Sequence, residues 1–373
     1  MEAIPTLYES TDTLETPSLL VDIDIMESNI RDYASFAESN GVILRSHVKT
    51  HKIPDIAHLQ REYSGEDGIV CQTLGEAEIM AQNGIDDIYL SYQVVGQQKL
   101  KRAVRLARKL SNFTTTVDGE GNIRPLQRIA SEHDVTIDVI LEIDIGLRRT
   151  GVPPGERVIK EATRVQEASN LNLRGLLAYE AHVKSKAETR ADYERYCTEA
   201  MDRTQEMVDQ LEVAGISIAE VKVGGTATSK YSGTHPVVTE INPGMYPFMD
   251  VGELEHRPFD VDKSDCAATV ISTVISKPTA DRAVIDAGSK AMSMDKSQLP
   301  VPKNRNDISY VNASEEHGWL DTRESERSLE VGDRIEFIVP HVCPTINLYD
   351  RIVGVRNRCV EELWDVAARG AVR

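Results

Sequence analysis

Short runs of β-branched and other apolar residues alternate with amphipathic stretches along the chain up to about residue 255. The runs that predict strands are SLLVDID (18–24), VILRSHV (42–48), GIVCQT (68–73), DIYLSY (87–92), FTTTVD (113–118), TIDVILEID (136–144), LRGLLAYE (173–180) and SIAEVKVGG (217–225). Stretches with apolar residues at helical spacing lie between them, such as residues 25–41, which Gly41 ends. Repeated strand–helix units predict a parallel sheet covered by helices, and about eight units fit a (β/α)8 barrel better than an open sheet.

The pattern changes after about residue 255, where turns separate strand-like runs and little helix is predicted. These runs are CAATVISTVISKP (266–278), RAVIDAGS (282–289), DRIEFIVPHV (333–342) and YDRIVGVR (349–356). We therefore expect an α/β chain with a barrel over residues 1–255 and a C-terminal mainly-β domain over residues 256–373. The first ~15 residues are free to pack on the second domain.

The charge of the chain narrows the choice of partners. The formal net charge of −18 argues against binding to nucleic acid or to an anionic membrane surface. No apolar run approaches the ~18–20 residues of a membrane span, and the first residues do not resemble a signal peptide. Where cations do cluster, they are therefore expected to face a small anionic ligand.

The cysteines indicate the compartment. The chain has 5 cysteines, an odd number, at widely scattered positions. They are Cys71, Cys197, Cys266, Cys343 and Cys359. This pattern is not a disulfide framework, and it predicts a reducing cytoplasm.

Polar residues follow the predicted barrel strands at their C-terminal ends, where barrel enzymes carry their active sites. They are His47, Lys49, Gln72, Arg149, Tyr179 and His182. The stretch LRSHVKTHK, residues 44–52, is the most crowded with cations. A partly desolvated lysine near other cations has a lowered pKa and can form a Schiff base. A solvated surface loop explains the stretch equally well, and the stretch alone does not choose between Lys49 and Lys52.

Three further loops carry candidate chemistry. In EIDIGLRRTG, residues 142–151, a glycine turn precedes two arginines, one of which is a candidate to meet an anion or a ring acceptor. The loops VGGTATS (223–229) and NPGMY (242–246) follow the last two predicted barrel strands. Their backbone N–H groups are suited to a phosphate, although each loop alone is more simply explained by turn glycines.

A candidate metal pair lies in PHVCPT, residues 340–345. If this segment is extended, His341 and Cys343 project to the same side, and imidazole with thiolate favours zinc over Mn²⁺ or Mg²⁺. Alone, a buried cysteine beside a hydrogen-bonded histidine is the more common arrangement. The segment EEHG (315–318) and His182 are further polar groups that could support a metal. The other histidines have no partner pattern and are expected to be structural or exposed: His58, His133, His235 and His256.

Together these segments resemble the fold-type III pyridoxal-phosphate (PLP) enzymes of the alanine-racemase-like class, and within it the D-threonine aldolase/D-serine dehydratase family. The resemblance runs from about residue 16 to residue 350 in family order. The matching segments are TPSLLVDIDIMESNI, LRSHVKTHK, CQTLGEAE, EIDIGLRRTG, GLLAYEAH, GGTAT, INPGMYPFMD, DAGSKAMSMD, SEEHG and PHVCPTINLYD.

The resemblance implies a role for each candidate residue. Lys49 would bind PLP covalently, and Arg149 would lie against the pyridine nitrogen and keep it unprotonated. The cofactor phosphate would be bound by Gly224, Gly225, Thr226, Gly244, Met245 and Tyr246. His47, Gln72 and Tyr179 would line the cofactor site, with Tyr179 or His182 as a second acid or base. His341 and Cys343 would bind the divalent metal, and the active protein would be a homodimer whose active site draws on both subunits.

Two departures from the family pattern stand near the cofactor. The chain has YEAH at residues 179–182 where family members often have YEGH. Its phosphate loop has Ala227 where glycine is common.

A PLP site with a metal suits a D-amino acid that bears a β-hydroxyl group, and two reactions are open. In dehydration, Lys49 removes the α-proton and the metal assists loss of the hydroxyl, which gives a 2-keto acid and ammonia. In retro-aldol cleavage, a base takes the hydroxyl proton, and the products are glycine and an aldehyde. In this family the motif His-x-Cys resembles the dehydratases, and the motif His-x-Asp resembles the aldolases. Cys343 therefore favours a dehydratase of the D-serine or D-threo-3-hydroxyaspartate type. The segment PTINLYD (344–350), however, also resembles aldolase sequences. An amino acid racemase and a non-enzymatic PLP-binding protein are the less favoured alternatives.

Overall fold

The computed structural model of the chain describes residues 5–373. Within it the chain forms two compact units. The barrel unit consists of residues 32–49, 54–244 and 370–373. The sheet unit consists of the described residues up to 31 together with residues 50–53 and 245–369. Helix α1 (Ile23–Asn40) begins in the sheet unit and ends in the barrel unit.

The barrel unit contains a sheet of eight strands that all pair in parallel. Its strands are β2 (Ile43–Leu44), β3 (Gly68–Cys71), β4 (Asp87–Gln93), β5 (Asn112–Val117), β6 (Ile137–Ile143), β7 (Leu171–Ala178), β8 (Glu220–Val223) and β9 (Glu240–Ile241), in the spatial order β2-β9-β8-β7-β6-β5-β4-β3. Beyond β2 the chain pairs with β3: Val48 N donates to Val70 O at 2.9 Å, and Val70 N donates to Ser46 O at 2.9 Å. These bonds join the first and last strands of the order, so the predicted (β/α)8 barrel is confirmed.

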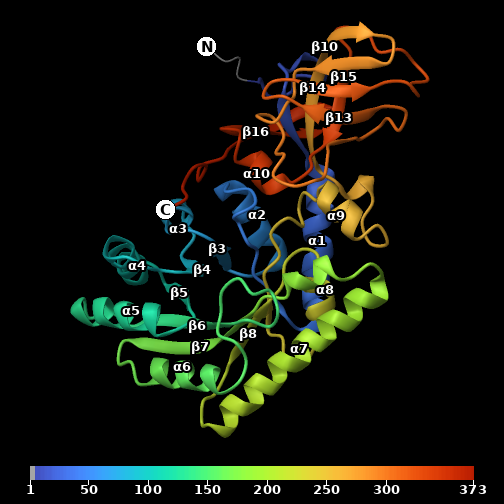
Figure 1. Ribbon diagram of the computed structural model, residues 1–373. Helices are drawn as coiled ribbons and strands as arrows, with labels where there is room; N and C mark the ends of the chain where they lie inside the picture. Colours follow the sequence, from blue (N-terminus) through green and yellow to red (C-terminus); the bar gives the residue numbers. More distant parts are fainter. Residues whose placement is uncertain (1–4) are drawn as a thin grey trace. The chain divides into compact units, whose positions relative to one another are not determined.

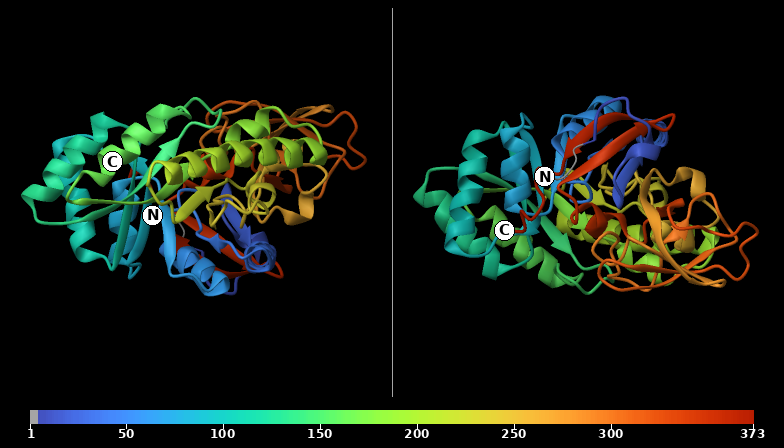
Figure 2. Two further views of the ribbon diagram at one scale, coloured as in Figure 1. Left: turned by 90° about the horizontal axis from the view of Figure 1, so that it is seen from below. Right: turned by 90° about the horizontal axis from the view of Figure 1, so that it is seen from above.

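Helices cover the outer side of these strands (Figure 1). They are α2 (Pro54–Ser64), α3 (Leu74–Gln82), α4 (Gln97–Lys109), α5 (Glu120–Glu132), α6 (Glu156–Gln166), α7 (Arg190–Val213) and the short α8 (Ser229–Ser232), with a 3₁₀ turn η2 (Ala181–Ser185). In α4 the buried residues Leu100, Ala103 and Val104 follow helical spacing and give one face toward the strands. Two further views show the teal helices α4 and α5 outside the strands from other directions (Figure 2).

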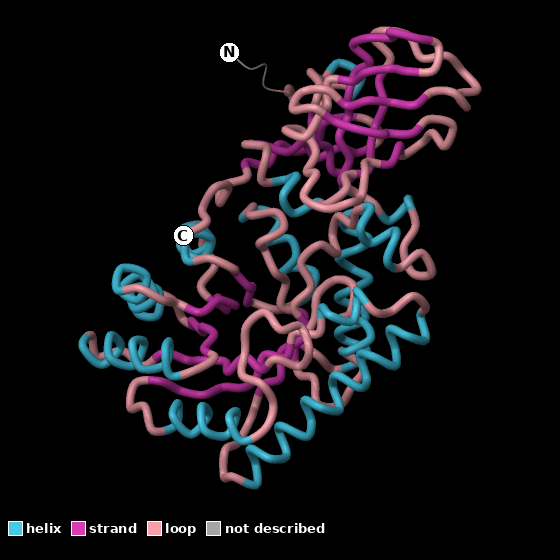
Figure 3. The backbone as a smooth tube through the Cα atoms, in the orientation of Figure 1, coloured by secondary structure: helices cyan, strands magenta, loops and turns pink. Residues whose placement is uncertain are grey.

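The sheet unit is built mainly from strands and loops with short helices (Figure 3). Its elements are η1 (Thr11–Thr13), β1 (Ser18–Asp22), α9 (Val251–His256), η3 (Lys263–Asp265), β10 (Ala268–Thr279), β11 (Arg282–Ile285), β12 (Val301–Pro302), β13 (Ser309–Ala313), β14 (Gly318–Asp321), β15 (Arg334–Ile338), α10 (Val342–Ile346), β16 (Arg351–Arg356) and β17 (Cys359–Asp365). The main order is β13-β14-β11-β10-β1-β16-β17, and β15 pairs with β10 and β12. The predicted C-terminal mainly-β architecture is confirmed.

One predicted barrel strand is wrong, and one barrel strand was not predicted. The run SLLVDID contains β1, which is not a barrel strand: it pairs antiparallel with β10 and parallel with β16 in the sheet unit. The last barrel strand is instead β9, of two residues. A strand of this length is too short to show an alternating pattern, so its sequence gave no signal. The predicted domain boundary between residues 255 and 256 stays a prediction.

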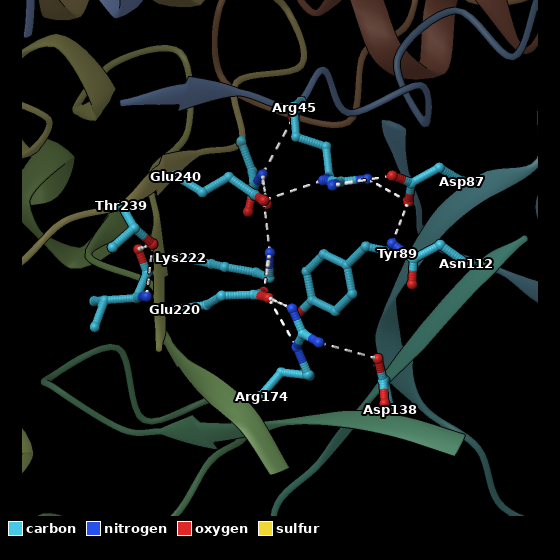
Figure 4. A network of polar contacts seen from close by, with 12 residues as sticks. Arg45, Asp87, Tyr89, Asn112, Asp138, Arg174, Glu220, Lys222, Thr239 and Glu240 are labelled. Atoms are coloured by element: carbon cyan, nitrogen blue, oxygen red, sulfur yellow. Dashed lines mark hydrogen bonds and ion pairs between the residues drawn. The ribbon is translucent and has the colours of Figure 1, made fainter. Parts of the chain in front are cut away.

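The barrel interior holds an apolar cluster of Val70, Tyr89, Ile140 and Leu177. Beside it, at the N-terminal ends of the strands, lies a network of charged side chains (Figure 4). Lys222 is only 2% exposed, and its Nζ lies 2.6 Å from Glu240 Oε2 and 2.9 Å from Glu220 Oε2. The same nitrogen lies 5.2 Å from the centre of the Tyr89 ring. Each buried charge in this layer therefore has an opposite charge beside it.

Arg45 extends the network to a further strand. Its Nε lies 3.1 Å from Glu240 Oε2, and its Nη1 lies 2.7 Å from Asp87 Oδ1. Burial alone lowers the pKa of Arg45, but the carboxylates of Glu240 and Asp87 outweigh this effect and raise it. Burial alone raises the pKa of Glu240, yet Lys222 and Arg45 bring it below its ordinary value. The charges of this network therefore compensate one another.

Candidate active site

Lys49 lies in the turn that follows β2, directly after the residues that pair with β3. The side chain of His47 is 5% exposed, and its Nε2 lies 3.1 Å from Gln72 Oε1. Because Gln72 Nε2 donates to Ser91 O at 2.8 Å, its oxygen faces His47, and His47 Nε2 must carry the proton. His47 Nδ1 is then an acceptor, 3.5 Å from the Lys49 backbone N. The structure therefore brings His47 and Gln72 together and gives the imidazole a defined tautomer beside Lys49.

Tyr179, Arg149 and the glycine loop after β8 also lie together. The Arg149 guanidinium carbon lies 4.9 Å from the centre of the Tyr179 ring, and Nη2 lies 3.7 Å from Glu142 Oε1. Tyr179 Oη lies 3.3 Å from the position that a Cβ atom on Gly225 would take. A side chain at Gly225 would therefore crowd this tyrosine. The Arg149 side chain is 51% exposed, so it remains accessible to a ligand.

The segment from Gly224 to Ser229 has the features of an anion cradle. Gly224 has a φ of +92°, and a Cβ atom there would lie 2.9 Å from Ser229 Cβ. The Ser229 side chain is buried, and its Oγ has no hydrogen-bond partner among the described residues. A buried hydroxyl without a partner is costly unless a ligand bonds to it. A phosphate group would supply such a partner for the Ser229 hydroxyl.

His182 lies in η2 and contacts the loop that follows β6. Its Nε2 lies 2.9 Å from the position of a Cβ atom on Gly146, whose φ of +141° also favours glycine. Its Nδ1 is buried without a hydrogen-bond partner among the described residues. Burial lowers the pKa of His182, and the charges of Lys186 and Arg203 lower it further. The imidazole is therefore neutral near pH 7, as a base requires.

His341 and Cys343 are close in the sheet unit, but the expected extended geometry is wrong. His341 is the N-cap of α10, which begins at Val342. Cys343 therefore lies in a helix, and the alternation of side chains along a strand does not apply to this pair. His341 Nδ1 lies 2.9 Å from Asp295 Oδ2, and Cys343 Sγ lies 3.3 Å from Thr50 Oγ1. With Nδ1 bonded to a carboxylate, His341 has Nε2 left for a metal. One imidazole and one thiolate form a donor set that fits zinc.

Within residues 5–373, no group of three or more His, Cys, Asp or Glu side chains is arranged to hold a metal ion. The segment EEHG runs from the turn after β13 to the first residue of β14, and in it Glu316 Oε1 bonds to Lys290 Nζ at 2.7 Å. The candidate protein ligands stay the predicted pair His341 and Cys343.

Two protein-family models match the chain. The model "Alanine racemase, N-terminal domain" matches residues 21–251, and "Putative serine dehydratase domain" matches residues 267–355. The first match alone covers more than half of the 373 residues. The chain belongs to the alanine racemase N-terminal domain family.

Individual relatives extend over nearly the whole chain. A 3-hydroxy-D-aspartate aldolase from Paracoccus denitrificans (strain Pd 1222) is 34% identical over 99% of this chain and 95% of its own length. A D-threo-3-hydroxyaspartate dehydratase from Delftia sp. (strain HT23) is 28% identical over 89% of this chain and 92% of its own length. The solved D-threonine aldolase from Filomicrobium marinum has a TM-score of 0.93 and 34% identity, and each chain is covered completely.

These matches confirm the resemblance to the D-threonine aldolase/D-serine dehydratase group of the alanine racemase N-terminal domain family, which is PLP-dependent and of fold-type III. The relatives include both aldolases and dehydratases, which are all lyases. No helix in residues 5–373 is long and apolar enough to cross a membrane.

The site residues of this family member occupy the expected positions along the chain, but their roles stay predictions. Gln72, Tyr179 and Gly224 each follow directly on the C-terminal end of a barrel strand. Gly244 lies shortly after β9 in the barrel unit. Met245 and Tyr246 belong to the sheet unit, where Tyr246 is fully buried.

Several acidic residues that contact the candidate site residues or the backbone beside them were not predicted. They are Glu142, Glu180, Asp250 and Asp295. Asp250 Oδ2 accepts from Val342 N at 3.0 Å, so it fixes the backbone between the two candidate metal ligands. Each of these acids lies inside a segment that was already of interest, but no spacing rule indicates which carboxylate will meet which backbone group across the fold.

Proposed function

We propose that this chain is a PLP- and divalent-metal-dependent lyase that acts on D-β-hydroxy amino acids, and that its main reaction is dehydration to a 2-keto acid and ammonia. The observation that carries the choice of reaction is the pair His341 and Cys343, with the His341 imidazole oriented by Asp295. A thiolate beside an imidazole is the ligand set that resembles the dehydratases of this family.

When bound, PLP supplies an electron sink for the α-carbon and the divalent cation supplies a Lewis acid for the β-hydroxyl. The amine of Lys49 takes the α-proton in this proposal. Arg149 would face the ring nitrogen of the cofactor, and its fixed positive charge would keep that nitrogen unprotonated. Tyr179 orients the cofactor through its contacts with Arg149 and the Gly225 loop. Neutral His182 is a candidate for the second acid or base.

The atoms of the dehydration balance without a further reactant. The α-proton and the β-hydroxyl leave the substrate as one water molecule. The unsaturated amine that remains takes up one water molecule and releases ammonia. The net products are therefore a 2-keto acid and ammonia, with no oxidant or reductant needed.

Retro-aldol cleavage is the second candidate. Relatives with 34% and 32% identity are a 3-hydroxy-D-aspartate aldolase and a D-threonine aldolase, whereas the dehydratase from Delftia sp. is 28% identical. In this reaction a base such as His182 takes the proton of the β-hydroxyl, and the bond between the α- and β-carbons breaks. The products are glycine and an aldehyde.

Product analysis separates the two candidates. The PLP-loaded protein is incubated with D-serine, D-threonine and D-threo-3-hydroxyaspartate, with and without a chelator. A 2-keto acid with ammonia supports dehydration, whereas glycine with an aldehyde supports the aldolase. The variant Cys343→Asp tests the ligand argument directly, since it should shift the products toward glycine and aldehyde. Activity that is unchanged by the chelator contradicts the metal assignment.

Metal affinity provides a test that does not depend on turnover. His341→Ala should abolish tight Zn²⁺ binding, and Asp295→Ala should weaken it by about 10- to 100-fold, because outer carboxylates orient ligand histidines and raise their basicity. Competition with a coloured chelator measures both effects. Asp321→Ala is the matched control, since this carboxylate belongs to an exposed ion pair with Arg323 elsewhere in the sheet unit. Equal affinities for Asp295→Ala and Asp321→Ala would show that Asp295 has no such role.

The proposal also includes a homodimer and a cytoplasmic location. Family resemblance supports a dimer whose active site draws on both subunits, and analytical ultracentrifugation at working concentrations tests it. All five cysteines are free in the structure, which supports a reducing compartment. Cell fractionation tests the location.

A further inference from the structure

Glu180 is a buried carboxyl group with no role in the proposed reaction. It follows Tyr179 at the end of β7 and has no exposed surface. Its Oε2 accepts a hydrogen bond from Gly224 N at 3.0 Å, and its Oε1 accepts one from Ser232 Oγ at 2.7 Å. Gly224 is the first residue after β8, and Ser232 is the last residue of α8. One carboxyl group therefore ties both ends of the segment 224–232, called the phosphate loop below.

The surroundings of Glu180 are unusual for an acid. Its hydrogen-bond donors are a backbone N–H and serine and threonine hydroxyl groups, all of them neutral. Burial raises the pKa of Glu180, and these donors offset the effect only in part. A carboxyl in such a place destabilises the fold when it ionises, and a smaller apolar side chain would avoid that cost. Its position is better explained by what its two oxygens hold.

A second anchor fixes the middle of the phosphate loop. Tyr33, a buried residue of α1, donates from its Oη to Thr226 O at 2.8 Å. Within the loop, Gly225 N lies 3.3 Å from Thr228 Oγ1. The loop is thus bonded at its start, its middle and its end, and Ser229 is the member whose buried hydroxyl has no partner among the described residues.

We propose that Glu180 is a positioning residue that holds the phosphate loop in the conformation that binds the phosphate group of PLP, with Tyr33 as the second anchor. This inference rests on the proposed function, because it takes the loop as the phosphate site. Glu180 acts through the backbone of Gly224 and the hydroxyl of Ser232, and it does not itself touch the cofactor. Its replacement should therefore weaken recognition of the phosphate and leave the reaction of Lys49 with the aldehyde intact.

The test compares PLP with pyridoxal, which has the aldehyde but no phosphate. The full-length protein, freed of cofactor, is titrated with each compound, and binding is followed by absorbance. The wild type should bind PLP more tightly than pyridoxal. Glu180→Ala should lower the PLP affinity by about 10- to 100-fold, since two donors lose their acceptor. Glu180→Gln keeps one oxygen acceptor, so its PLP affinity should lie between those of the wild type and Glu180→Ala. Tyr33→Phe should weaken PLP binding by about 2- to 10-fold. Pyridoxal affinity should not change in any of the three.

Glu161→Gln is the matched control. Glu161 is 5% exposed and bonds to Arg164 within α6, so this variant changes a buried carboxyl group that does not contact the phosphate loop. It should leave the affinities for PLP and pyridoxal as in the wild type.

The outcomes separate this inference from the function on which it rests. A ratio of PLP to pyridoxal affinity in Glu180→Ala equal to that of the wild type overturns the positioning role. If Glu180→Ala does not fold, Glu180→Gln decides by the same ratio. A wild type that does not distinguish PLP from pyridoxal contradicts the phosphate site itself, and with it the proposed function.

Discussion

The two ends of the barrel treat their polar side chains in opposite ways. At the N-terminal ends of the strands, Lys222 and Glu240 are buried and Arg45 is partly exposed, and each of the three lies within 3.1 Å of an opposite charge (Figure 4). At the C-terminal ends, Ser229 Oγ and His182 Nδ1 are buried with no partner among the described residues. The charges at one end compensate one another, and the other end has hydrogen-bonding capacity left over at Ser229 and His182.

This difference links one end of the barrel sheet to stability and the other end to function. Charges that compensate one another specify how the strands pack. Removing one of them leaves its partner buried in a low dielectric without an opposite charge. Polar groups without a protein partner reduce stability, and they persist where a ligand completes them. In barrel enzymes the C-terminal ends of the strands carry the active site, and the distribution here agrees with that rule.

Lys49→Ala should have the largest effect, and only on function. Loss of the amine that binds PLP and takes the α-proton should lower activity by at least about 1000-fold, while stability changes by less than about 1 kcal/mol. Borohydride reduction followed by peptide mapping should label Lys49 in the wild type and nothing in the variant. Label on Lys52 instead would show that the assignment within residues 44–52 is wrong.

Lys222→Met should have the converse effect. It removes the cation that the buried carboxylate of Glu240 shares with the partly exposed carboxylate of Glu220, and this loss costs about 3–5 kcal/mol of unfolding free energy. Urea denaturation measures the loss, and activity per folded molecule should be retained.

Two variants control this experiment. Arg124→Gln removes an exposed ion pair with Glu120 in the same unit and should change stability by less than about 0.5 kcal/mol. Adding Glu240→Gln to Lys222→Met should recover part of the loss, because one uncompensated charge is removed. A double variant no more stable than Lys222→Met would contradict the account of the network.

Ser229→Ala should stabilise the cofactor-free protein. Its buried hydroxyl has no partner among residues 5–373, so its removal should raise the unfolding free energy by up to about 1 kcal/mol while PLP affinity falls. Thr116→Val is the matched control, since the Thr116 hydroxyl lies 2.9 Å from Tyr89 Oη in the barrel interior and its loss should cost about 1 kcal/mol. Both are measured by urea denaturation without cofactor, and opposite signs are expected.

The fold was predictable where elements repeat. Alternating runs and amphipathic stretches indicated a barrel, because each strand–helix unit carries its own periodic signal. The pattern failed at β1, since an apolar strand looks the same in either sheet, and at β9, whose two residues carry no period. Pairing partners decided both cases, and pairing is a long-range property.

The candidate site was predictable to the level of segments. Strand ends and glycine loops indicated where His47, Gln72 and Gly224 lie. They did not indicate that Glu180 bonds to Gly224 N, 44 positions away, or that Asp295 bonds to His341, 46 positions away. Hydrogen bonds of this kind depend on the register of neighbouring strands and loops, which no local spacing contains.

The pH dependence of stability should differ in sign between the two ends. Burial raises the pKa of Glu180 above 4.5, so its favourable contribution is complete below that value and is lost as the pH rises through the folded-state pKa. Glu240 has a pKa below 4.5 despite its burial, because Lys222 and Arg45 outweigh desolvation, so its contribution is present above 4.5 and lost as the pH falls.

Neither Glu180→Gln nor Glu240→Gln titrates at the replaced position. The unfolding free energy of the wild type minus that of Glu180→Gln should therefore decrease as the pH rises from 4.5, whereas the same difference for Glu240→Gln should decrease as the pH falls below 4.5. Urea denaturation of the three proteins on both sides of pH 4.5 measures both slopes. Slopes of equal sign would mean that the two ends do not differ in how they compensate buried charge.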